Sequence, residues 1–181
     1  MLHLKNITAG NPKTAEQYQM TKQHGITWLF SEDDQNWYEE LKNFASDTIK
    51  MVYTGDGRVV WVGKDVTGIE PRNASVIEVP DITANRRITV PGYWFYRDDK
   101  FVFDYKLKAE DERDALLQRV SIMTSEWEKD LLLGLISDED REKLKAYRIY
   151  AKSLQVMDFS TITDKASYNA IEWPVSPEAS S

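Results

Sequence analysis

Metal-binding and nucleophilic side chains are sparse in this sequence, and none has the spacing of a known site. The two histidines, His3 and His24, have 20 residues between them and there is no cysteine, so no common zinc pattern can be built. The acidic stretch that begins at Glu32 resembles a calcium loop, but it has no glycine at its sixth position, and Tyr38 falls where an oxygen ligand is needed. The chain also lacks a Gly-x-Ser-x-Gly elbow, a phosphate loop and a dinucleotide fingerprint. We therefore predict no metal, no cofactor and no enzymatic activity.

Aromatic and arginine side chains are the better candidates for binding chemistry. Of the 21 aromatic residues, 15 lie in residues 1–105. An aromatic side chain can belong to the core of a small β module, or it can contact a partner or a sugar ring. Two adjacent arginines in a polar segment can contact a partner or stay solvated, and the sequence leaves these alternatives open. The candidate partner-binding residues are Trp37, Trp61, Arg86, Arg87, Trp94 and Tyr96.

The composition limits the classes of partner. The 181 residues carry a formal net charge of -7, with 29% charged residues and a mean hydropathy of -0.54. Phosphate contacts need clustered Lys and Arg, which neither half of the chain has, so we expect no nucleic-acid partner. No apolar run approaches the roughly 18 residues of a spanning helix, and the amino terminus lacks the basic-then-apolar order of a signal peptide. We expect a cytosolic globular protein with no membrane insertion.

Residues 1–105 have the pattern of a β module. The sequence Thr54-Gly55-Asp56-Gly57 separates two β-prone runs, and Asp-Gly in that position is typical of a hairpin. A second hairpin is expected around residues 97–100, whereas residues 81–92 have no clear period and are expected to form an exposed loop. The expected strands are residues 26–30, 49–53, 58–62, 75–79, 94–96 and 101–103.

One short helix is expected within this module. Thr14 is a suitable N-cap, Gln17 lies three residues later in a capping-box pattern, and Gly25 can end the helix. On this helix we expect Tyr18 to face the core.

After Lys106 the apolar period becomes helical. Residues 106–181 predict two amphipathic helices that form an antiparallel hairpin, because only a short linker separates them. We expect Gly134 to end the first helix and Ser137 to be the N-cap of the second. Two helices bury little apolar surface, so the hairpin needs a partner, which could be the β module, a second copy or another protein. The segment Ile171–Pro174 is the one apolar spot in the tail, and it could dock on its own protein or on a partner. The self-association candidates are Val120, Trp127, Leu131, Tyr147 and Trp173.

These elements predict an α+β protein: an aromatic-rich, mainly antiparallel β module with a short helix, followed by a C-terminal helical hairpin. We expect residues 1–105 to make a binding surface or a core, and residues 106–181, with their tail, to pack on a partner, which includes a copy of the same chain.

Several strings in the chain resemble the tail fibre assembly proteins of Mu-like and lambdoid bacteriophages and their prophages. The most specific is VPDITANRR from Val79, because neither composition nor periodicity would generate it. The chain departs from the family pattern at residues 88–93 and in the spacer at residues 168–170. The other matching strings are KNITAGNPKTAEQYQMTK from Lys5, WLFSEDDQNWYEE from Trp28, DTIKMVY from Asp47, LLLGLISDEDREKLKAYRIYAKSLQVMD from Leu131 and IEWPVSP from Ile171.

The resemblance implies a chaperone in the host bacterial cytoplasm. It would bind the C-terminal, receptor-binding region of a phage tail fibre protein through its first module, and promote folding and trimerisation through its second. Some members of the family remain on the fibre tip. An alternative from another class is an adhesin-tip module that binds host lipopolysaccharide directly. A glycan hydrolase with paired carboxylates is a third alternative, which no feature of the sequence supports.

Overall fold

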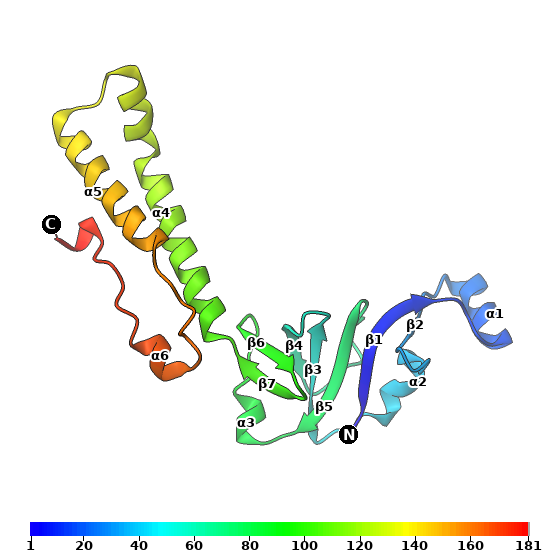
Figure 1. The fold of residues 1–181 in the computed structure, drawn as a ribbon. Coiled ribbons are helices and arrows are strands. Elements are labelled where there is room, and N and C mark those ends of the chain that lie inside the picture. The colour runs from blue at the N-terminus through cyan, green and yellow to red at the C-terminus, as the bar shows by residue number, and fades with distance from the viewer. Residues whose placement is uncertain (181) are drawn as a thin grey trace. The chain divides into compact units, whose positions relative to one another are not determined.

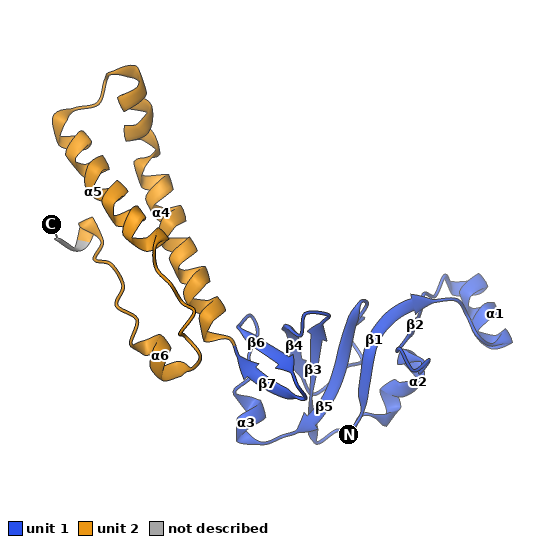
Figure 2. Cartoon of the chain, in the orientation of Figure 1, with its two compact units in different colours: residues 1–103 blue, residues 104–181 orange. Residues whose placement is uncertain are grey.

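The computed structural model describes residues 1–180. The chain forms two compact units, residues 1–103 and residues 104–181 (Figure 2). The first holds two antiparallel sheets and short helices, and the second is helical, which confirms the predicted α+β class (Figure 1).

A five-stranded antiparallel sheet is the framework of the first unit. Its strand order is β2-β1-β5-β3-β4, and a separate hairpin, β6–β7, forms a second sheet. The predicted hairpins are both present, but the first strand was not predicted. The strands are β1 (His3–Gly10), β2 (Trp28–Phe30), β3 (Thr48–Thr54), β4 (Val59–Gly63), β5 (Ala74–Pro80), β6 (Trp94–Arg97) and β7 (Lys100–Phe103).

The two faces of the sheet carry different parts of the core, because successive side chains of a strand point to opposite faces. On β3, Val52 belongs to one buried cluster and Met51 to the other. The first cluster includes Leu29 of β2 and Trp37, and residues of the following segment pack against it. The second includes Ile88, and Trp94 and Phe101 of the β6–β7 hairpin pack against it. The groove described below lies on this second face.

Short helices connect the strands of the first unit. The helix α1 begins and ends as predicted: Thr14 Oγ1 accepts a hydrogen bond from the Gln17 N–H at 3.1 Å, and Gly25 has a φ of 66°. The prediction that Tyr18 faces the core was wrong, since its side chain is 53% exposed. The buried residue of α1 is Gln17, whose amide is satisfied by the Lys13 N–H and by Glu39. These helices are α1 (Ala15–His24), α2 (Trp37–Glu40), the 3₁₀ turn η1 (Leu41–Asn43) and α3 (Thr83–Arg86).

The segment of residues 81–92 is more ordered than the predicted exposed loop. It contains α3, and Ile88 is 3% exposed within the second core cluster. Ile88, together with the half-buried Val90, therefore fixes the segment to the sheet, and this could not be predicted from its aperiodic sequence.

The second unit is an antiparallel helical hairpin followed by a tail. The helices α4 (Tyr105–Leu133) and α5 (Asp138–Gln155) lie side by side (Figure 1). Their caps are the predicted ones: Gly134 has a φ of 71°, and Ser137 Oγ accepts a hydrogen bond from the Asp140 N–H at 3.1 Å. The tail contains α6 (Lys165–Asn169) and a 3₁₀ turn, η2 (Pro177–Ser180).

The tail folds back on the hairpin. Trp173 packs against the buried cluster of α4 and α5 and lies 5.7 Å from the ring of Phe159. The Tyr168 hydroxyl donates to the Glu112 carboxylate at 2.6 Å. The apolar spot in the tail thus has its partner within the same unit.

Candidate partner-binding groove

An open groove of about 430 Å³ lies on the second face of the sheet. Its floor is made by Ile77 and Val79 of β5. The helix α3 and the segment after it provide one side, and β6, β7 and their turn provide the other. The residues on the α3 side are Ala84, Asn85, Arg87 and Ile88. The lining residues of the β6–β7 hairpin are Trp94, Tyr96, Asp99, Lys100 and Phe101.

Two tight turns position the hairpin that lines the groove. Asp98 and Asp99 have φ values of 50° and 57°, the left-handed pair that a two-residue hairpin loop requires. The second support is the β3–β4 turn, where the Gly57 carbonyl accepts a hydrogen bond from the Tyr96 N–H at 2.7 Å. Since Gly57 has a φ of 88°, its lack of a side chain allows this close approach. The aromatic residues of β6 are therefore held by the turn of another hairpin.

Aromatic side chains form a half-buried cluster beside the groove. The rings of Tyr53 and Tyr96 lie 4.8 Å apart, and the ring of His3 meets that of Tyr96 edge-on at 5.5 Å. The His3 Nε2 and Tyr53 hydroxyl oxygen are 2.6 Å apart, and Tyr96 donates to Asp99 Oδ1 at 3.2 Å. These side chains come from β1, β3 and β6, so only the folded sheet brings them together.

The titratable groups of this cluster are held in their uncharged forms. Burial lowers the pKa of His3, and the positive charge of Lys5 lowers it further. Burial, together with the hydrogen bond to Asp99, raises the pKa of Tyr96 to about 12. The cluster therefore offers aromatic faces and neutral hydrogen-bonding groups at neutral pH, which suits contact by packing.

The two arginines near the groove differ in their surroundings. Arg86 Nε pairs with Asp81 Oδ1 at 2.6 Å, and Lys64 pairs with the other oxygen of Asp81 at 2.7 Å. Hydrogen bonds from Arg86 and Lys64 lower the pKa of Asp81 to about 2. Arg87, by contrast, is exposed and lines the groove. Of this pair, Arg87 is therefore the cation that lines the groove.

The structure brings together only some of the predicted contact residues. Arg87, Trp94 and Tyr96 line the groove, and Arg86 is next to them in α3. Trp37 is 1% exposed in the first core cluster, so the prediction that it is a contact residue was wrong.

Trp61 is also outside the groove. It is half-buried and packs against the first cluster, on the other face of the sheet from the groove. For both Trp37 and Trp61, the large apolar area of an indole favoured the core.

Sequence reasoning missed the contribution of β1 because a bulge hides its period. Leu4 and Ile7 are both fully buried although they are three residues apart. Asn6, with a φ of 47°, lies at the point where the pairing with β5 shifts register. A bulge adds a residue to one strand and breaks the alternation by which strands are recognised. His3 was consequently not assigned to the aromatic cluster.

The predicted self-association residues lie mostly inside the second unit. Val120 and Tyr147 are 5% and 6% exposed, and Trp127 packs against Tyr147 with ring centres 5.9 Å apart. Trp173 is half-buried on the same cluster. Val120 and Trp127 of α4 are therefore covered by α5 and the tail. Of the five candidates, Leu131, at 46% exposed, is the one on the surface.

Neither a metal centre nor a membrane helix is found in the part of the chain that the structure describes. Among residues 1–180, no three His, Asp or Glu side chains are placed to hold a metal ion. Within the same residues, every helix is too short or too polar to cross a membrane. What the described residues do offer is a β-rich unit with an aromatic groove, joined in sequence to a helical hairpin.

Comparison with known proteins identifies the family. Residues 39–178 match the family described as Caudovirales tail fibre assembly protein, lambda gpK. The chain belongs to this tail fibre assembly family, which confirms the resemblance.

Three phage proteins are similar to almost the whole chain. Tail fiber assembly protein U' of Escherichia phage Mu is 49% identical over 168 residues, which cover 90% of this chain and 95% of that protein. Tail fiber assembly protein U' of Escherichia phage P1 is 47% identical over 168 residues, with the same coverage. Tail fiber assembly protein U of phage Mu is 39% identical over 184 residues, covering 98% of this chain and all of that protein.

Proposed function

We propose that this protein is a chaperone that binds the C-terminal region of a phage tail fibre protein and promotes its folding and trimerisation in the host cytoplasm. Membership of the tail fibre assembly family carries the general role. We propose the groove on the second face of the sheet as the site of contact, because it is open and lined by aromatic, apolar and charged side chains.

The physical need for such a chaperone follows from fibre architecture. A trimeric β-rich tip forms through non-local strand pairing, which is slow and leaves strand edges and apolar surface exposed. A groove that covers this surface during assembly prevents aggregation without a nucleophile or a nucleotide. If the complex persists after trimerisation, the protein remains on the fibre tip, and mass spectrometry of purified virions tests that extension.

Co-expression with the fibre gene tests the proposal. We expect the fibre to be insoluble alone, and to be recovered as a soluble trimer bound to this protein when both are expressed. Arg87→Glu and Lys100→Glu reverse exposed charges of the groove without disturbing its apolar floor, and we expect both to reduce recovery of the complex. Lys22→Glu makes the same charge change on α1, away from the groove, and serves as the control.

Two results would contradict parts of this proposal. A fibre that trimerises equally well without the protein would refute the chaperone role. A normal yield of complex from both groove variants would keep the role but exclude the groove as the contact site.

A second candidate function is direct binding of host lipopolysaccharide. The observation that favours it is the cluster of His3, Tyr53 and Tyr96, whose uncharged rings could stack on sugars. Calorimetric titration of the isolated protein with purified lipopolysaccharide tests this function. Absence of any binding heat at high ligand concentration would exclude it.

A further inference from the structure

Two exposed cations line the groove on the second face of the sheet without an acidic partner. Arg87 follows α3 on one side of the groove, and Lys100 begins β7 on the other. Among residues 1–180, neither side chain is paired with a carboxylate. The groove therefore presents two positive charges that a ligand can neutralise.

The charged groups next to these two cations are already satisfied within the chain. Arg86 and Lys64 both pair with Asp81, at 2.6 and 2.7 Å. Asp99 is the one acid among the lining residues, and its Oδ1 accepts a hydrogen bond from the Tyr96 hydroxyl at 3.2 Å. The lining thus has more basic than acidic residues, in a chain whose formal net charge is -7.

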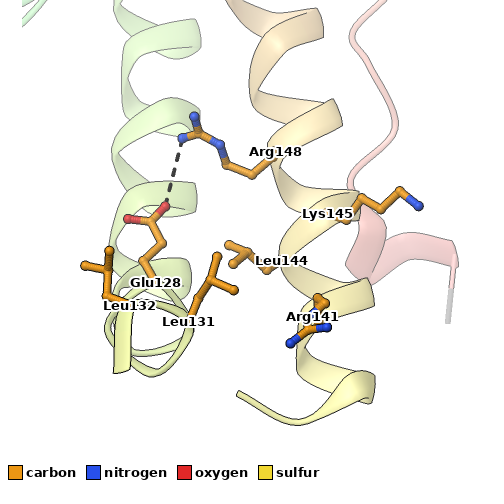
Figure 3. A pocket seen from close by; sticks show the side chains of 7 residues that line it. All are labelled: Glu128, Leu131, Leu132, Arg141, Leu144, Lys145 and Arg148. Carbon is orange, nitrogen blue, oxygen red and sulfur yellow. Dashed lines mark ion pairs between the residues drawn. The ribbon is translucent and has the colours of Figure 1, made fainter. Parts of the chain in front are cut away.

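The groove at the tip of the helical hairpin differs in this respect (Figure 3). It has a volume of about 510 Å³, and three of its lining residues are basic. Arg148 pairs with Glu128 at 3.9 Å, while Arg141 and Lys145 pair with acids of their own helix at 3.9 and 3.7 Å. The basic residues of that groove are matched by their own chain, so they do not indicate an acidic ligand.

An apolar surface lies between Arg87 and Lys100. The floor residues Ile77 and Val79 continue into Ile88, and all three belong to the second buried cluster or pack against it. The groove volume of about 430 Å³ falls in the range of ligand sites, roughly 300–1,000 Å³. Apolar side chains of a peptide can cover such a floor, whereas a glycan would bring hydroxyl groups to it.

We propose that the groove binds a short segment of the fibre protein in which acidic residues flank apolar ones. The apolar side chains lie on the floor, and the flanking carboxylates pair with Arg87 and Lys100. The Arg87 guanidinium can hold a carboxylate through two parallel hydrogen bonds, whereas the Lys100 ammonium acts as a point charge. This inference rests on the proposed function, and it adds the chemistry of the segment that is bound.

Charge exchange between the two proteins tests the inference. Each Asp and Glu in the C-terminal region of the fibre is changed to Lys, one at a time, and each fibre variant is co-expressed with the wild-type protein, Arg87→Glu or Lys100→Glu. We expect Arg87→Glu to lower the amount of recovered complex about tenfold, as the loss of one close interfacial charge pair predicts. One fibre variant should lower recovery with the wild-type protein and restore it with Arg87→Glu.

Arg86→Gln is the matched control for Arg87→Gln. Arg86 is adjacent in the chain, but it is paired with Asp81 and does not line the groove. We expect Arg87→Gln to lower recovery of the complex, and Arg86→Gln to leave it unchanged. Arg87→Lys keeps the charge and should retain most of the complex. Circular dichroism of each variant confirms that it is folded, as the exposure of Arg87 leads us to expect.

Three results would overturn the inference. In the first, the wild-type complex forms but no fibre variant restores binding to Arg87→Glu or Lys100→Glu, which leaves the chaperone role intact. In the second, Arg86→Gln and Arg87→Gln reduce recovery equally. In the third, purified lipopolysaccharide binds the wild-type protein but not Arg87→Gln, which would assign the groove to a glycan. A fibre that trimerises alone is a separate outcome, because it refutes the proposed function itself and the inference with it.

Discussion

Gly57 is the position where a single methyl group should have the largest effect on the groove. A Cβ atom there would lie 2.5 Å from the carbonyl oxygen of Tyr96, and the φ of 88° is one that an alanine rarely adopts. The backbone strain of a left-handed residue costs about 1–2 kcal/mol. Displacing β6 weakens the Tyr96 N–H hydrogen bond to Gly57, which adds about 1 kcal/mol. We therefore expect Gly57→Ala to lower the free energy of unfolding by about 2–3 kcal/mol.

Gly55 of the same turn provides a matched control. A Cβ at Gly55 meets no atom within 4 Å, and its φ is not in the left-handed range, so Gly55→Ala should change stability by less than about 0.5 kcal/mol. Urea unfolding followed by tryptophan fluorescence measures the free energy of unfolding of both variants. The amount of fibre that Gly57→Ala captures shows whether a displaced Tyr96 weakens binding. Equal unfolding free energies for the two variants would refute the reasoning, because only Gly57 approaches β6.

Three further predictions concern stability. Glu78→Gln should cost about 2–4 kcal/mol in urea unfolding, since the 5% exposed carboxylate accepts hydrogen bonds from the N–H groups of Leu2 and Ala45 and an amide cannot replace both. Trp173→Ala should lower stability by about 2–3 kcal/mol, and an unchanged melting temperature would show that the tail does not dock on the hairpin. The pKa of His3 is lowered in the folded state, so the unfolded chain binds a proton first as the pH falls below the usual 6.5, and stability is lost from that pH downward. His3→Gln should flatten this pH dependence, and a slope identical to that of the wild type would contradict the assignment.

Local chemistry accounts for the elements that the sequence predicted well. Thr14, Gly25, Gly134 and Ser137 are all caps that act on neighbouring residues, so their types alone located the helix ends. The two hairpins could also be predicted from the sequence, because each turn needs particular residues at adjacent positions. The change to a helical period after Lys106 falls within the first turn of α4, because the period is also a pattern of residues that are close in the chain.

Burial was harder to predict, since it depends on which surfaces meet. Trp37 and Trp94 are both indoles in the first unit, yet one is fully buried on the first face and the other lines the groove. Gln17 is buried in place of Tyr18 because Lys13 and Glu39 satisfy its amide, and Glu39 is 22 residues away in the chain. No local pattern contains that information.

The sequence by itself determined the fold class, the hairpins, the helix caps and, through the segments that resemble known proteins, the family. Those features depend on residues that are close in the chain. Tertiary structure alone decided that His3, Tyr53 and Tyr96 form one cluster beside a groove, because their strands β1, β3 and β6 are distant in sequence. It also decided that Val120 of α4 is covered by α5 and the tail, whereas the leucines at the hairpin tip stay exposed. A periodic pattern shows which side chains need to be buried, whereas only the packed chain shows what buries them.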